Sequence, residues 1–364
     1  MRVHQVLSGA GPHDAITTEA LVFRSYFRRW EWGGADYAAR IAPAVNGSVE
    51  QLGRLRPGPG DVLLIHHSAG VPRLHELLAL PNPKLLLYHN VTPASWLWNH
   101  APLVGVQCAI GRQQLPELVG AVDVAASDSQ FNAAELRARG ASRTEVIPLL
   151  VDLERLGPTL PRAGAAAPKP AEGPVIMFVG RLSPHKRQDE LIRVFAQYRR
   201  HREPGARLML VGDPIAPGYT DSLHALAGAL APGAVTIESG LEARELGDRY
   251  RSASTFVCLS EHEGFCIPLL EAFHFGLPVI ARPAGAVPEV AGDAALLVED
   301  RDPAVIAELV NLAITDSALR AELGRRGRAR LERYAPDAVA QRLRSAVERT
   351  AEVARARDHT GVRR

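Results

Sequence analysis

The feature of this sequence that most constrains its fold is an alternation of two kinds of segment. Short runs rich in Val, Ile and Leu alternate with longer stretches whose apolar residues recur at helical spacing. This pattern is typical of buried parallel strands joined by crossover helices, and it predicts an α/β fold. The strands expected in the first half are Val3–Leu7, Val62–His66, Leu85–His89, Val122–Ala126 and Val146–Leu150. Those expected in the second half are Val175–Val179, Leu208–Val211, Val235–Ile237, Phe256–Leu259, Val279–Ala281 and Ala295–Val298.

The chain length and one biased stretch predict how the domains divide. At 364 residues the chain exceeds what one hydrophobic core usually serves, so the two sets of strands predict two doubly wound domains. Between them lies the stretch PRAGAAAPKPAEGP, whose Pro, Gly and Ala content is typical of a linker. We therefore expect an N-terminal domain at 1–156, a linker at 157–173 and a C-terminal domain at 174–335. A helix and a basic tail are expected at 336–364.

Composition excludes several classes of protein. The hydrophobic content of 46% and the absence of a long uninterrupted apolar run are those of a globular protein without a membrane span. The first residues lack the apolar core of a signal peptide, so we expect a cytoplasmic protein. Three cysteines without metal-ligand spacing predict reduced thiols and neither a disulfide framework nor a zinc site. A net charge of +2 argues against a nucleic-acid partner.

The charge is nevertheless unevenly placed. Between Arg320 and Arg364 there are 13 arginines against 6 acidic residues. A solvated helix face is one interpretation, and peripheral contact with an anionic membrane or a lipid-linked acceptor is the other. The basic and aromatic stretch Val22–Trp32 has the same two interpretations, since it could also form a packed first helix.

The loop Ser260–Cys266 is the first candidate binding site. In open α/β sheets, ligands bind outside the carboxyl ends of the strands, and this loop follows an expected strand and leads into a helix with Pro268 in its first turn. The unsatisfied backbone N–H groups and the helix dipole there favour a diphosphate or sugar hydroxyls. Glu263 in the loop and Glu271 in the helix supply carboxylates that can hold the hydroxyls of a sugar and of a ribose.

These residues carry a family resemblance. Two glutamates separated by seven residues, with Gly264-Phe265 and Pro268 between them, resemble the signature of family 4 glycosyltransferases. The segments Gly276–Ala281 and Gly285–Val290 resemble the strand and loop that follow in that family. Upstream, Phe178–Lys186 resembles its phosphate-binding segment. Together they cover nearly all of the second half in the same order.

The resemblance implies a fold and an activity. It implies the GT-B architecture, in which two Rossmann-like domains face each other across a cleft, with residues 336–364 packing back on the first, acceptor-side domain. It implies a retaining enzyme that moves a hexose-type sugar from a UDP- or GDP-sugar to an acceptor hydroxyl. Surface polysaccharide or glycoconjugate biosynthesis is the expected role, and the acceptor itself is unknown. It also implies catalysis without a metal or cofactor.

The resemblance further implies roles for individual residues of the second half. Arg181 and Lys186 follow a strand, where two cations can converge on one diphosphate and stabilise the charge that grows as it leaves. Glu263 is expected to position the sugar and to balance its developing positive charge. The other donor-binding residues are expected to be Gly264, Phe265, Cys266, Ile267 and Glu271. Two positions depart from the family pattern, since Arg187 and Cys266 stand where glycine is common.

The first half offers one catalytic candidate. The segment Leu86–Pro93 is similar to the part of the acceptor domain in which the family places an active-site histidine, so His89 is expected to face the donor sugar and leaving phosphate. His66 and His67 follow another strand and are either acceptor-side or structural residues. The segment Ser127–Asn132 is explained by helix capping, with an acceptor contact as the alternative.

A glycine pattern near the N-terminus resembles part of a nucleotide-binding motif. Gly9–Asp14 begins like a dinucleotide fingerprint, but Asp14 stands at the sixth position, where Gly or Ala is required, which argues against a nicotinamide site. In the family a glycine turn here lets the backbone approach the donor phosphate, and Gly11 is expected to do so.

Other interpretations stay open. Asp300-Arg301-Asp302 has the letters of a metal-binding motif from another architecture, but Asp302 before Pro303 is better explained as a helix N-cap. A natural-product glycosyltransferase or a catalytically silent GT-B subunit that binds sugar nucleotides would share the same donor residues. A phosphorylase-like enzyme would require a pyridoxal phosphate lysine, and a dehydrogenase is the most distant alternative.

Overall fold

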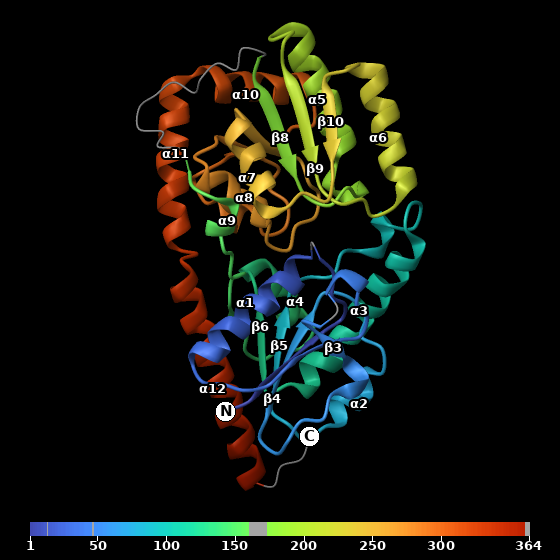
Figure 1. The fold of residues 1–364 in the computed structure, drawn as a ribbon, viewed down its shortest axis with the longest axis vertical. Coiled ribbons are helices and arrows are strands. Elements are labelled where there is room, and N and C mark those ends of the chain that lie inside the picture. Colours follow the sequence, from blue (N-terminus) through green and yellow to red (C-terminus); the bar gives the residue numbers. More distant parts are fainter. Residues whose placement is uncertain (13, 46, 160–172, 361–364) are drawn as a thin grey trace. The chain divides into compact units, whose positions relative to one another are not determined.

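The computed structural model describes residues 1–12, 14–45, 47–159 and 173–360. The chain forms two compact units, each built around its own parallel sheet (Figure 1). Unit 1 comprises Met1–Ser95, Pro102–Val151 and Tyr334–Arg364, and unit 2 comprises Trp96–Ala101 and Asp152–Arg333. Most of the expected linker, residues 160–172, lies outside the described residues.

The sheet of unit 1 has seven strands, all parallel, in the order β3-β2-β1-β4-β5-β6-β7. In chain order they are β1 Val3–Leu7, β2 Asp36–Ala38, β3 Glu50–Gln51, β4 Val62–His67, β5 Lys84–Tyr88, β6 Val124–Ser127 and β7 Glu145–Val146. The strand order reverses between β1 and β4, so the carboxyl ends of these two strands flank a topological switch point.

The sequence prediction for this sheet is confirmed at its centre and wrong at both edges. The expected strand Val146–Leu150 pairs with β6 only as far as Val146, because the following apolar residues are buried without forming a ladder. The short edge strands β2 and β3 were not predicted, because they lack a run of apolar residues. Burial and strand pairing are separate requirements, and an apolar run reports only the first.

The helices of unit 1 are α1 Ala15–Arg29, α2 Leu74–Ala79, α3 Pro102–Ala121, α4 Gln130–Ala138 and α12 Pro336–Thr360, with short 3-10 turns at Pro43–Val45, Leu52–Arg54 and Ala94–Trp96. Phe23 and Phe27 of α1 are fully buried and share one core with Leu343 of α12. The basic and aromatic stretch is therefore a packed first helix. Residues 336–360 belong to unit 1, where Arg349 pairs with Glu145 at 2.6 Å.

The sheet of unit 2 has six parallel strands in the order β10-β9-β8-β11-β12-β13. They are β8 Val175–Val179, β9 Arg207–Val211, β10 Val235–Glu238, β11 Thr255–Cys258, β12 Val279–Ala281 and β13 Leu296–Leu297. All six lie where the sequence predicted them, although β13 is shorter than expected. The order reverses between β8 and β11, which makes their carboxyl ends the switch point of this sheet.

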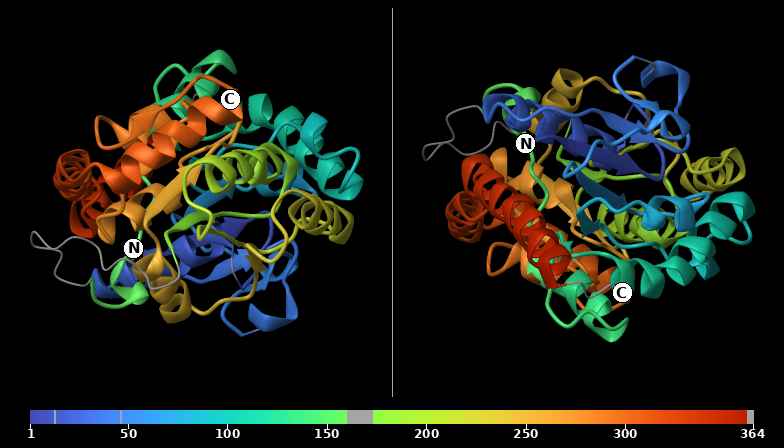
Figure 2. Two further views of the ribbon diagram at one scale, coloured as in Figure 1. Left: turned by 90° about the horizontal axis from the view of Figure 1, so that it is seen from above. Right: turned by 90° about the horizontal axis from the view of Figure 1, so that it is seen from below.

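The helices of unit 2 are α5 Gln188–His201, α6 Pro217–Leu230, α7 Ala243–Ser252, α8 Ile267–His274, α9 Val287–Ala291, α10 Pro303–Thr315 and α11 Ser317–Glu332, with 3-10 turns at Glu154–Leu156 and Pro184–Lys186. Figure 2 shows helices on both sides of each sheet. Asp302 caps α10 by accepting a hydrogen bond from the N–H of Ala304, with Pro303 in the first turn, as predicted.

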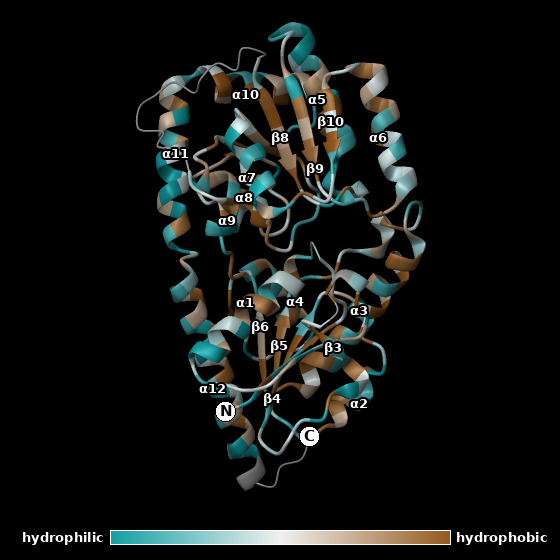
Figure 3. Cartoon of the chain, in the orientation of Figure 1, coloured by the Kyte–Doolittle hydropathy of each residue, from teal (hydrophilic) through white to brown (hydrophobic). Residues whose placement is uncertain are grey.

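The distribution of apolar residues follows these layers. Hydrophobic colour is concentrated on the central strands of each sheet, while α11 and α12 carry many hydrophilic residues (Figure 3). Among the described residues, no helix combines the length and the hydropathy needed to cross a membrane.

Candidate functional site

The carboxyl ends of β8 and β11 bring two of the predicted residues into direct contact. Lys186 ends the 3-10 turn that follows β8, and Glu263 lies in the loop between β11 and α8. The Nζ atom of Lys186 is 2.7 Å from Oε2 of Glu263, and the carboxylate is 7% exposed. Because β8 and β11 are neighbours in the sheet, residues far apart in sequence meet at the switch point of unit 2.

The surroundings favour the charged form of Lys186. Burial by itself lowers the pKa of Lys186, but the charge and hydrogen bond of Glu263, together with the neighbouring thiols of Cys266 and Cys258, raise the pKa above its ordinary value. The adjacent His185 is affected in the opposite sense, since burial and then the charge of Lys186 lower its pKa to about 2. Lys186 is therefore a fixed cation at neutral pH, and His185 is a neutral hydrogen-bonding group.

The backbone beside Glu263 depends on one glycine. Gly285 has a φ of +59°, and a Cβ atom there would lie 2.0 Å from the carbonyl oxygen of Glu263. The N–H of Ala286 donates to that same carbonyl at 3.0 Å. Only glycine permits this approach, so the loop after β12 supports the position of Glu263.

Glu271 is held by a different pair of donors. It lies in α8, is 3% exposed, and receives Arg155 Nη2 on Oε1 and the hydroxyl of Tyr250 on Oε2, both at 2.8 Å. A carboxylate fixed by two donors has a defined orientation and keeps lone pairs for further hydroxyl groups. Arg155 and Tyr250 were not predicted, because no local motif marks them and they reach Glu271 only through the fold.

The loop between Glu263 and α8 explains one departure from the family pattern. Phe265 and Cys266 are buried, and Ile267 is the first residue of α8. Cys266 has a φ of +77°, a left-handed conformation that glycine adopts at little cost. Arg187, the other departure, has a φ of +54° immediately before α5. Glycine is thus the residue with least backbone strain at both positions.

Arg181 lies at the same edge of the sheet but makes no ion pair with Glu263. It lies two residues after the end of β8 and is exposed, and its carbonyl accepts a hydrogen bond from Gln188 at 2.9 Å. Within the described residues its side chain makes no hydrogen bond or ion pair. Its charge is felt by His185, whose pKa it helps to lower. The structure therefore leaves the Arg181 side chain available for a ligand.

His89 belongs to a buried polar cluster in unit 1. It follows β5, and its Nε2 atom is 3.0 Å from Nδ1 of His66 at the end of β4. Its Nδ1 atom lies 3.5 Å from Oδ2 of Asp128, and Glu19 of α1 places Oε2 3.6 Å from His89 Nε2. The sequence did not predict Glu19. It placed His66 and the segment containing Asp128 only as secondary candidates.

His66 and His67 have separate surroundings although they are adjacent. Successive residues of a strand point to opposite faces of a sheet. His66 faces Glu19 and Phe23 of α1, whereas Nε2 of His67 donates to the carbonyl of Gly111 in α3 at 2.9 Å. His67 therefore lies outside the His89 cluster.

The first glycine loop is explained locally. Asp14 is the N-cap of α1 and accepts a hydrogen bond from the N–H of Thr17 at 2.8 Å. The N–H of Gly11 donates to the Thr17 hydroxyl at 3.1 Å. Capping thus accounts for Asp14 at the sixth position of the glycine pattern, and the predicted approach of Gly11 to a phosphate stays a prediction.

Two groups of side chains among the described residues have ligand atoms close enough to hold a metal ion. One consists of Glu19, His66 and His89, and the other of Cys258, Glu263 and Cys266. In the second group the cation of Lys186 already occupies one oxygen of Glu263.

Comparisons with known proteins agree with this arrangement. The family model described as glycosyl transferases group 1 matches residues 163–330. A D-inositol 3-phosphate glycosyltransferase of Streptomyces bingchenggensis is 30% identical over 350 residues, covering 91% of this chain and 72% of that protein.

Two solved structures share the fold. Sucrose-phosphate synthase of Thermosynechococcus elongatus superposes with a TM-score of 0.74 at 18% identity, covering 94% of this chain and 97% of that one. Anabaena HepE, solved with UDP and glucose, also gives 0.74 at 16% identity, covering 96% and 99%. The two doubly wound sheets are thus those of the GT-B fold predicted from the sequence. Together with the matching relative, they show that this chain belongs to the group 1 glycosyltransferases.

Proposed function

We propose that this protein is a retaining glycosyltransferase that moves a hexose-type sugar from a UDP- or GDP-sugar to an acceptor hydroxyl. The observation that carries the proposal is the contact of Lys186 with Glu263 at the switch point of unit 2, where parallel α/β sheets bind ligands. The name of the Streptomyces relative supports sugar transfer to a hydroxyl compound. Surface polysaccharide or glycoconjugate biosynthesis is the role we assign to the product.

In this proposal each predicted donor residue has a task. Lys186 and the exposed Arg181 bind the diphosphate and stabilise the charge that it gains as the bond to the sugar breaks. Glu263 binds sugar hydroxyls, and Glu271 binds the ribose. The loop Gly264–Ile267 contributes backbone groups at the start of α8. Gly11 and His89 act from unit 1 on the donor phosphate and sugar.

The proposed reaction proceeds on one face of the sugar. The bond from the anomeric carbon to the diphosphate breaks as the acceptor oxygen attacks from the same side, and the acceptor proton passes to the leaving phosphate oxygen. This route retains the anomeric configuration and needs no protein nucleophile. It also needs no metal, because the two cations supply the positive charge.

Ligand-dependent thermal shifts test the donor assignment. The folded protein should be stabilised by UDP or by GDP and by the matching sugar nucleotide, since a ligand that binds only the folded state raises the melting temperature. The anomeric configuration of the product, read by NMR, then tests retention. Activity that survives a chelator supports metal independence. Absence of a shift with every nucleotide, or an inverted product, would contradict the proposal.

A further inference from the structure

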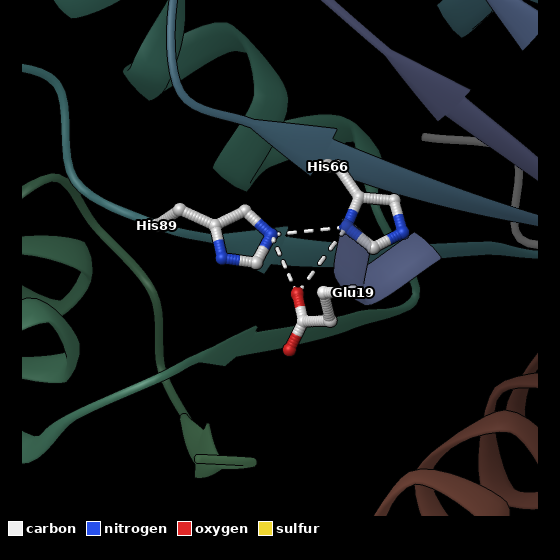
Figure 4. A group of neighbouring side chains, drawn as sticks. All are labelled: Glu19, His66 and His89. Atoms are coloured by element: carbon white, nitrogen blue, oxygen red, sulfur yellow. Dashed lines mark hydrogen bonds and ion pairs between the residues drawn. The ribbon is translucent and has the colours of Figure 1, made fainter. Parts of the chain in front are cut away.

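In the cluster around His89, the residues at its outer end, Gln5 and Asp36, determine which ring nitrogens donate hydrogen bonds and which accept them. Figure 4 shows His66 and His89 with one ring nitrogen of each turned toward the other and the carboxylate of Glu19 beside them. The side chains of all three are at most 2% exposed. Whether each ring nitrogen carries a hydrogen is therefore decided by the protein groups that face it.

The amide of Gln5 fixes the proton on His66. Its Nε2 atom donates to the carbonyl of Ala20 and to Oδ1 of Asp36, both at 2.7 Å. The reverse orientation would place the amide oxygen against two acceptors, so Oε1 of Gln5 is the atom that faces Nε2 of His66 at 3.0 Å. An amide oxygen only accepts, and His66 Nε2 therefore carries a hydrogen.

Asp36 cannot reverse this direction. Its carboxylate is paired with the buried guanidinium of Arg24 at 2.7 Å, which keeps it an acceptor. The direction of donation thus runs from His66 to Gln5 and from Gln5 to Asp36.

This direction determines the proton on His89. Burial, followed by the charge of His89, lowers the pKa of His66 well below its ordinary value, so His66 is neutral and its Nδ1 atom is an acceptor. His89 Nε2, 3.0 Å away, must then be the donor. The other nitrogen of His89, Nδ1, is buried and makes no hydrogen bond among the described residues, but it lies at an ion-pair distance of 3.5 Å from Oδ2 of Asp128, and this carboxylate favours a hydrogen on it. With a hydrogen on both nitrogens, His89 is an imidazolium.

The charges around His89 support this state. Burial alone lowers the pKa of His89, but the charge of Glu19, the acceptor carboxylate of Asp128 and the charges of Asp128 and Asp14 raise it above the ordinary value. The two neighbouring histidines of β4 are neutral, because burial lowers the pKa of His66 and lowers that of His67 to about 4. The charges around His89 thus favour its imidazolium form.

A metal ion is the competing way to supply that charge, since an atom equidistant from the three inner ligand atoms would lie about 2 Å from each, close to a zinc bond length. The ring geometry disfavours it. The two rings are within 4° of parallel, and the 5.2 Å between their centroids nearly equals the 3.0 Å between the nitrogens plus the two ring radii. The lone pairs therefore point at each other, as a shared proton requires, and do not converge on a third point.

We propose that Glu19, His66 and Asp128 are positioning residues that hold His89 as a buried imidazolium, with Nε2 donating to His66 and Nδ1 facing the carboxylate of Asp128. In this state His89 has no lone pair, so it acts as a fixed positive charge at the end of β5 and not as a general base. The effect of that charge on the leaving phosphate rests on the proposed function, whereas the charge state itself does not.

The direct test is NMR of the full-length protein labelled with ¹⁵N in its histidine rings, with signals assigned through His66→Asn, His67→Asn and His89→Asn. At pH 7 both nitrogens of His89 should show the imidazolium shift. His67 is the matched internal control, because it is equally buried but faces no carboxylate, and it should show a neutral ring. A neutral His89 in the wild-type protein would overturn the proposal, as would a stoichiometric metal ion that is lost in His89→Asn.

Two carboxylate variants test the positioning residues. Asp128→Asn and Glu19→Gln should each lower the pH at which His89 loses its proton by about one unit or more, while Asp123→Asn, which removes a buried carboxylate outside the cluster, should not. Unchanged titration in both cluster variants would contradict the assigned roles. If NMR shows the imidazolium but no sugar nucleotide binds, the charge state stands and the proposed function fails.

Discussion

The Nζ atom of Lys186 lies 2.7 Å from the carboxylate of Glu263, although Glu263 comes 77 positions later in the sequence (263 − 186 = 77). Strands β9, β10 and β11 lie between the two residues along the chain, and the pairing of β8 with β11 brings them together. Each side chain compensates the burial of the other. Loss of one partner therefore leaves an uncompensated charge, which is costlier than loss of both.

Lys186→Met should accordingly destabilise unit 2 by about 3 kcal/mol, the usual order for a broken buried pair. The double variant Lys186→Met with Glu263→Gln should cost less than the sum of the two single variants. Urea unfolding of the wild type and the three variants measures this coupling. Strict additivity of the two single effects would show that the contact contributes nothing.

Gly285→Ala should displace the loop that carries Glu263. The added methyl group would meet the Glu263 carbonyl at 2.0 Å in addition to the strain of a positive φ. Gly240→Ala is the matched control, because Gly240 also has a positive φ, +68°, but has nothing within 4 Å of the added atom. We expect a loss of about 1 kcal/mol in the control and a larger loss, with reduced donor turnover, in Gly285→Ala. Equal losses in stability would argue against the support we assign to Gly285.

Tyr250→Phe should loosen Glu271 without removing its charge. The hydroxyl donates to Oε2 at 2.8 Å, and a hydrogen bond to a charged group contributes about 1.5 to 3 kcal/mol. If Glu271 binds the ribose, the variant should raise the KM for the sugar nucleotide more than it lowers kcat. Steady-state kinetics separate these effects, and a fall in kcat alone would place Glu271 in the chemical step.

The stability of unit 1 should decrease as the pH rises through neutrality. Burial raises the pKa of Glu19 from 4.5 to about 7, so the folded state binds a proton that the unfolded state has already released. The resulting stabilisation is complete below pH 4.5 and is lost as the pH rises through about 7. His89, whose pKa is also raised, acts in the same direction. Urea unfolding at pH 5.5 and pH 8 should show a smaller difference for Glu19→Gln than for the wild type, and an equal difference would contradict this assignment.

The elements that the sequence predicted share a physical basis. A central parallel strand is buried on both faces, so it appears as an apolar run, and its carboxyl end is where Glu263 and Lys186 were expected. The partners of these residues could not be predicted in the same way. Arg155 reaches Glu271, and Glu19 reaches His89, only because the chain folds back across its sheet, and neither residue belongs to a motif.

The edge strands of the unit 1 sheet could not be predicted from apolar runs. Glu50–Gln51 forms a strand although both residues are exposed, and Leu149 and Leu150 are buried beyond the end of the paired register at Val146. Glycine patterns were more informative than they first appear, since Arg187 and Cys266 were recognised as departures and prove to have left-handed backbones.

Release of nucleoside diphosphate from a sugar nucleotide tests the central claim most directly. The wild-type protein should release the diphosphate from a UDP- or GDP-sugar, and Lys186→Met should reduce the rate by roughly 100-fold or more. Arg301→Met is the control, since Arg301 is an exposed cation of the same unit that pairs with Glu261, and its rate should equal that of the wild type. Equal rates for wild type and Lys186→Met, or no release from any sugar nucleotide, would contradict the account.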